Sequence, residues 1–85
     1  MNHPCEAVAD LEHSLLISPG YDSVHYYLAA AYRQLNNQSK ARASLDILEK
    51  SEVEDDEVPM LKGKIPEERA KLEKIPKTAT IRSCL

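Results

Sequence analysis

The sequence predicts an all-α fold in which antiparallel helix-turn-helix units stack, with a weakly ordered C-terminal tail. Apolar residues recur at helical spacing over residues 4–50, two short turn signals interrupt them, and small and large residues repeat after a fixed interval. The 85 residues make one domain at most. Because Trp and Phe are absent, Leu, Ala, Ile, Val and the four Tyr must build the core.

The first predicted helix covers about residues 4–17. Pro4 suits its first position, where a missing amide costs no hydrogen bond. Ser18-Pro19 ends it. Its expected inner face consists of residues at three- and four-residue spacing: Ala7, Leu11, Ser14 and Leu15.

The second predicted helix covers about residues 23–35, and Asp22 or Ser23 can cap it through a side-chain oxygen. Asn36-Asn37 is its stop signal, because Asn tolerates the left-handed backbone conformation. Its apolar face is expected to hold Val24, Tyr27, Leu28, Ala31, Tyr32 and Leu35.

The third predicted helix covers about residues 38–50, with Ala41, Leu45 and Leu48 on one face. We expect the helical domain, residues 4–50, to end there. Residues 51–85 read as an acidic linker, a short helix at 66–74 and a flexible tail. Pro59 and Pro66 fall inside any further long helix, so another repeat is not expected.

Two of these helices match each other at a 34-residue offset. Ala7 corresponds to Ala41, and Leu11 corresponds to Leu45. The helix between them carries Leu28-Ala29 followed by Tyr32. These spacings resemble the tetratricopeptide repeat family over residues 5–50, about one and a half repeats of an α-solenoid. His25 replaces the family's Trp, and Ala29 replaces its Gly. The resemblance implies that the following residues pack the repeats together: Ala7, Leu11, Leu28, Ala29, Tyr32, Ala41, Leu45 and Leu48.

The resemblance also implies a protein-interaction module or scaffold that binds a protein or peptide partner. In the family, the first helix of each pair lines a concave groove. Here that helix would offer Ser23, Tyr26, Ala30, Arg33 and Gln34. Tyr26 would stack on a partner side chain and Arg33 would meet a carboxylate. The alternative is that all five are ordinary solvated residues.

Two other functions stay open. The chain could be the C-terminal capping fragment of a larger repeat protein, with repeats upstream or self-association completing the stack. It could also be the regulatory domain of an enzyme, with no independent activity. A melt of the isolated chain separates a self-standing module, which unfolds cooperatively, from a fragment.

Several classes of function are not expected. The net charge of −3 and the lack of a basic stripe disfavour nucleic-acid binding, and no apolar run could span a membrane. We expect no enzymatic activity, catalytic residue, metal or cofactor, because His3, Cys5 and His13 match no ligand spacing and no phosphate loop occurs. Cys5 and Cys84 are expected to be unrelated free thiols. With no signal peptide, the chain would be cytoplasmic if it is complete.

Overall fold

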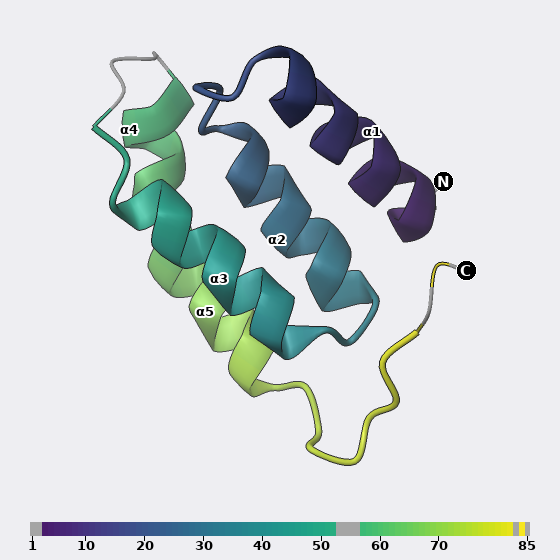
Figure 1. Ribbon diagram of the computed structural model, residues 1–85. Helices are drawn as coiled ribbons and strands as arrows, with labels where there is room; N and C mark the ends of the chain where they lie inside the picture. The colour runs from purple at the N-terminus through teal and green to yellow at the C-terminus, as the bar shows by residue number, and fades with distance from the viewer. Residues whose placement is uncertain (1–2, 53–56, 83, 85) are drawn as a thin grey trace.

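The computed structural model describes residues 3–52, 57–82 and 84. Within these residues the chain is all-helical, which confirms the predicted fold class. Helices α1, α2 and α3 lie side by side with alternating direction, and α5 lies against α3 and α2 (Figure 1). The helices are α1 (Pro4–Ile17), α2 (Val24–Gln34), α3 (Gln38–Glu49), α4 (Glu57–Lys62) and α5 (Ile65–Glu73).

The turn between α2 and α3 is formed by two asparagines, as the sequence predicts. Asn36 has a positive φ of 61°, the left-handed conformation that Asn tolerates. The Asn37 amide donates to the Tyr32 carbonyl at 2.9 Å and closes α2. The Asn37 side chain then accepts a hydrogen bond from the Lys40 amide at 3.3 Å and starts α3. Two adjacent residues thereby end one helix and begin the next.

The predicted cap of α2 is wrong. Ser23 stands at the N-cap position, but its side chain makes no capping hydrogen bond. The Asp22 carboxylate instead accepts a hydrogen bond from the Ser51 hydroxyl at 2.6 Å. Asp22 therefore ties the start of α2 to the segment that follows α3.

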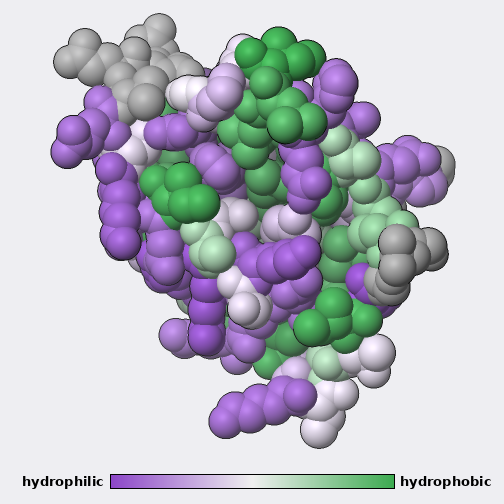
Figure 2. Space-filling view, viewed as in Figure 1, coloured by the Kyte–Doolittle hydropathy of each residue, from purple (hydrophilic) through white to green (hydrophobic). Residues whose placement is uncertain are grey.

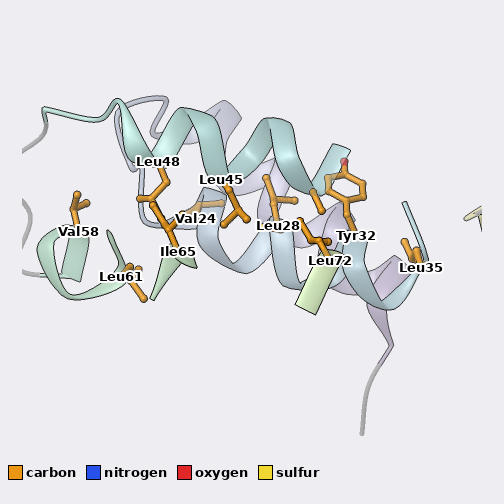
Figure 3. Packing of buried hydrophobic residues seen from close by; sticks show 12 residues of the cluster. Val24, Leu28, Tyr32, Leu35, Leu45, Leu48, Val58, Leu61, Ile65 and Leu72 are labelled. Carbon is orange, nitrogen blue, oxygen red and sulfur yellow. The ribbon is translucent and has the colours of Figure 1, made fainter. Parts of the chain in front are cut away.

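The core lies where α2 meets α3 and α5. Leu28, Leu45 and Leu48 point into the same space (Figure 3). Ala29 and Ala41 are buried too, and their small side chains let the helices approach closely. Six of the eight predicted packing residues are therefore in the core. Leu11 is partly buried against it, and Ala7 is half-buried at its edge.

The packed fold continues past residue 50, so the predicted boundary there is wrong. Val58, Leu61, Ile65 and Leu72 all belong to the same apolar cluster as α2 and α3. Two short helices replace the long one that the prolines forbid. Pro59 is the third described residue of α4, and Pro66 lies at the start of α5, where missing amides cost little. Part of the acidic linker, residues 53–56, lies outside the described residues.

The buried positions of α2 recur on α4 and α5 at a 37-residue offset. Residues 24, 28, 31 and 35 are buried in and just after α2, and residues 61, 65, 68 and 72 are buried in α4 and α5. The α4–α5 pair thus packs its inner face as α2 does, although it is bent at Gly63 and Lys64.

The tail is folded back rather than frayed over the residues described. It runs from the end of α5 past the α2–α3 turn to the start of α1 (Figure 1). The Arg82 amide donates to the Leu35 carbonyl at 2.9 Å, and a disulfide joins Cys84 to Cys5 with Cα atoms 5.3 Å apart. The expectation of two unrelated thiols is therefore wrong. A sequence separation of 79 residues gave no sign that the two ends meet.

Candidate interaction groove

An open pocket of about 250 Å³ lies between α1 and α2, and we name it the α1–α2 groove. Its lining is mainly apolar, and its polar groups are an imidazole, a phenol and a carboxamide. The lining residues are His3, Pro4, Ala7, Leu11, Tyr27, Ala30, Ala31 and Gln34.

Helical spacing and small side chains create this hollow. Ala7 and Leu11 lie one turn apart on α1, and Tyr27, Ala31 and Gln34 follow each other at turn spacing on α2. Alanines at the centre leave room that a larger residue would fill. The result is an open hollow with a mainly apolar lining.

Two of the five predicted groove residues, Ala30 and Gln34, line this groove. Ser23 does not, because it is 0% exposed. Among the described residues its hydroxyl has no hydrogen-bond partner. The prediction that Ser23 faces a partner is therefore wrong. It rests on the resemblance to the family, which does not reveal that the segment after α3 contacts the start of α2 through Ser51 and Asp22.

Tyr26 and Arg33 face α5 rather than open solvent. Tyr26 is partly buried against the core, and its ring meets Tyr27 edge to face at 5.5 Å. Burial raises the pKa of Tyr26, and the Glu68 charge adds to the effect. Arg33 Nε lies 3.3 Å from a carboxylate oxygen of Glu68, which is only 3% exposed. Arg33 already has a carboxylate from its own chain.

Of the eight residues that line the groove, the predicted groove set contained only Ala30 and Gln34. Tyr27 was expected in the core, but it is 42% exposed and lines the groove. Its spacing to Ala30 and Ala31 was a usable signal, since residues three and four apart share a face. No sequence feature pointed to His3 and Pro4, which reach the groove only because α1 lies beside α2.

A second pocket, of about 320 Å³, lies under the C-terminal tail, and we name it the tail pocket. Helices α1, α2 and α3 and the α2–α3 turn supply Val8, Glu12, Tyr32, Leu35, Asn37 and Lys40, and the tail supplies Ile81, Arg82 and Cys84. The Tyr32 hydroxyl donates to Glu12 Oε1 at 2.8 Å, and Lys40 Nζ lies 5.5 Å from the centre of the Tyr32 ring. Burial, together with the bond to Glu12, raises the pKa of Tyr32 to about 12.

The other titratable side chains of the described residues include one partly buried imidazole and no metal-binding group. Among the residues described, no three His, Cys, Asp or Glu side chains lie close enough to hold a metal ion. His25 has a lowered pKa because burial disfavours the imidazolium, and the nearby Asp22 opposes that effect. No helix in the described part of the chain has the length and apolar character needed to cross a bilayer.

The helix order, the small-residue contacts and the recurring buried positions describe a helical repeat, and the comparison with protein families agrees. Residues 3–65 match the model of the tetratricopeptide repeat. The chain belongs to the tetratricopeptide repeat family. The match extends from just before α1 to the first residue of α5, so it includes residues beyond 50, where no repeat was expected. Comparison with curated proteins and with solved structures gave no match.

Proposed function

We propose that this tetratricopeptide repeat protein is an interaction module that binds a helical segment of a partner protein in the α1–α2 groove. The family generally provides protein-interaction surfaces rather than catalytic ones. The observation that carries the proposal is the position of α5. It packs on α2 and α3 within the chain, while the corresponding surface beside α1 and α2 holds an open apolar groove.

The apolar face of α1 supports this proposal. Among the described residues, α1 has no fully buried side chain, although Val8, Leu11 and Leu15 all pack partly against the core. We infer the kind of partner segment from α5, which packs on α2 and α3. Its buried residues Ile65 and Leu72 are seven positions apart, two turns of one face. We therefore expect the partner to offer apolar side chains at three-, four- and seven-residue spacing.

Within the groove, Ala30 and Gln34 have different roles. The Ala30 methyl group lets a partner helix approach α2 closely, as Ala29 and Ala41 do inside the core. Gln34 supplies a carboxamide that can donate to and accept from a partner backbone. Tyr27 offers an exposed ring for apolar contact.

A further repeat of the same polypeptide is the second candidate for this groove, favoured by the incomplete burial of α1. The chain would then be a capping unit of a larger assembly, and binding in trans would be absent.

A displayed library of amphipathic helical peptides tests the proposal. Selected clones should share apolar residues at helical spacing and should lose binding to the Ala30→Glu variant. Ala43→Glu is the matched control, because Ala43 is exposed on α3 and outside the groove. Clones that bind Ala30→Glu as well as wild type would place the interaction elsewhere. Failure to enrich any helix would favour the capping unit.

A further inference from the structure

We propose that residues 80–82 and Cys84 are a tethered ligand of the C-terminal end of α2 that covers the tail pocket, and that the Cys5–Cys84 disulfide is a redox lock that keeps them there. When the disulfide is reduced, the segment leaves and the pocket opens. This inference rests on the contacts of the tail, and it is independent of the α1–α2 groove.

The tail segment binds the end of α2 as a separate peptide would. The Arg82 amide donates to the Leu35 carbonyl at 2.9 Å, and the Arg82 guanidinium donates to the Gln34 carbonyl at 2.6 Å. The Asn36 carboxamide donates to the Thr80 carbonyl at 3.1 Å. Carbonyls at a helix C-terminus lack intrahelical donors, and the cationic Arg82 also suits the negative end of the helix dipole.

These contacts are too few to hold the tail by themselves. Ile81 is 55% exposed although it lines the tail pocket, and both Arg82 and Cys84 are exposed. Each ordered residue loses conformational entropy, and a few solvent-exposed hydrogen bonds offset only part of that loss. The disulfide fixes Cys84 beside α1 and so raises the effective concentration of the tail at the end of α2 for as long as the disulfide is intact.

The part of the tail pocket that the helices form is held by contacts among the helices themselves. Tyr32 is held by Glu12 of α1, and Lys40 of α3 lies over the Tyr32 ring. Helices α1, α2 and α3 therefore shape the cavity among themselves. Once the tail has left, the pocket keeps an apolar wall, a carboxylate and open helix carbonyls. These groups suit an extended segment with an apolar residue followed by Arg.

The chemistry of release is ordinary thiol–disulfide exchange. A thiolate of a dithiol reductant attacks one sulfur, the Cys5–Cys84 bond breaks, and the second thiol of the reductant resolves the mixed disulfide. Two electrons and two protons pass to the cysteines, which become thiols, and the reductant becomes a disulfide. Exposure of Cys84 gives the reductant access, and exposed disulfides tend to be labile and regulatory.

Hydrogen exchange on the full chain, oxidised and reduced with dithiothreitol, tests the lock. Peptides from residues 75–85 should lose protection on reduction, whereas α2 and α3 should keep theirs. The Cys5→Ser/Cys84→Ser variant should behave like the reduced chain under oxidising conditions. Unchanged protection of the tail after reduction would overturn the proposal. Loss of protection in α2 and α3 at the same time would also overturn it, because the disulfide would then merely support the whole fold.

A binding measurement tests the ligand role separately. Because the same contacts do not hold the attached tail without the disulfide, a free peptide of residues 78–85 with Cys84→Ser should bind the Cys5→Ser/Cys84→Ser protein only weakly, in about the millimolar range, as followed by NMR titration. It should bind the oxidised wild type at least about tenfold more weakly. The same peptide with Arg82→Ala is the control and should bind poorly to both. Equal binding to the oxidised and the cysteine-free protein would contradict a locked pocket.

Discussion

Glu68 of α5 carries a buried carboxylate. At the 37-residue offset between the buried positions, the corresponding residue of α2 is Ala31. Burying a charge is costly unless partners compensate for the lost hydration. Arg33 Nε lies 3.3 Å from one carboxylate oxygen, and Lys71 Nζ lies 3.2 Å from the other. Arg33 thus joins α2 to α5, and this role explains why it is not available to a partner's carboxylate.

Replacing Arg33 should therefore destabilise the fold more than replacing an exposed arginine. Arg33→Ala leaves Glu68 buried with Lys71 as its remaining charged partner, and we expect a loss of about 1–3 kcal/mol. Arg69→Ala is the control, because its partners Asp46 and Glu49 are exposed, and it should cost at most about 1 kcal/mol. Urea unfolding measures both. Equal losses of unfolding free energy would show that the Arg33–Glu68 pair does not stabilise the packing of α5 on α2.

Tyr32 makes a pH-dependent contribution to stability. Its pKa is raised from 10.0 to about 12 in the fold, so an unfolded chain releases the phenolic proton at lower pH than the folded chain. The contribution is complete below pH 10 and is lost as the pH rises to about 12. The free energy of unfolding should therefore fall over this range.

Tyr32→Phe isolates that contribution. It removes the hydrogen bond to Glu12, which should cost about 1 kcal/mol near neutral pH, and it removes the alkaline titration. Urea unfolding at several pH values between neutrality and pH 12 should give a shallower decline for Tyr32→Phe than for wild type. Parallel declines would mean that another group titrates.

At the scale of the element, the helices that the sequence predicted well are those whose start and end signals are local. Asn36 and Asn37 end α2 and begin α3 through their own side chains and backbone, so these two residues are enough to predict the turn. The short helix predicted at residues 66–74 corresponds to α5, whereas α4 and the packing of both helices on the core were missed because the prolines indicated a break. They sit in the first turns of two short helices, and the apolar spacing runs across the bend between them.

The contribution of α4 to the core can be measured with adjacent residues. Leu61→Ala removes a side chain that is 2% exposed and should cost about 2–4 kcal/mol. Met60→Ala is the matched control, since Met60 is 56% exposed, and it should change stability by at most about 0.5 kcal/mol. If the two variants melt alike, α4 is not part of the cooperative unit.

At the scale of the whole molecule, the surface separates the groove from other apolar groups. On the face shown in Figure 2, apolar side chains form patches among hydrophilic ones, and one patch lies near the upper edge, where α1 ends. Leu16 and Ile17 at that end are 80% and 70% exposed. The α1–α2 groove differs from these exposed side chains because it is hollow. It also lies beside α2, on which α5 of the same chain packs. Sequence reasoning found Ala30 and Gln34, but it could not foresee the placement of residues brought together by the fold, such as His3 beside α2.

The most direct measurement is chemical-shift mapping of a selected helical peptide on the isotope-labelled full chain. If the α1–α2 groove is the binding surface, amide shifts should concentrate at Ala7, Leu11, Tyr27, Ala30 and Gln34. The exposed face of α3, around Arg42 and Ala43, should stay unchanged. Shifts centred on α3 or α5, with the groove residues unaffected, would contradict the proposed function.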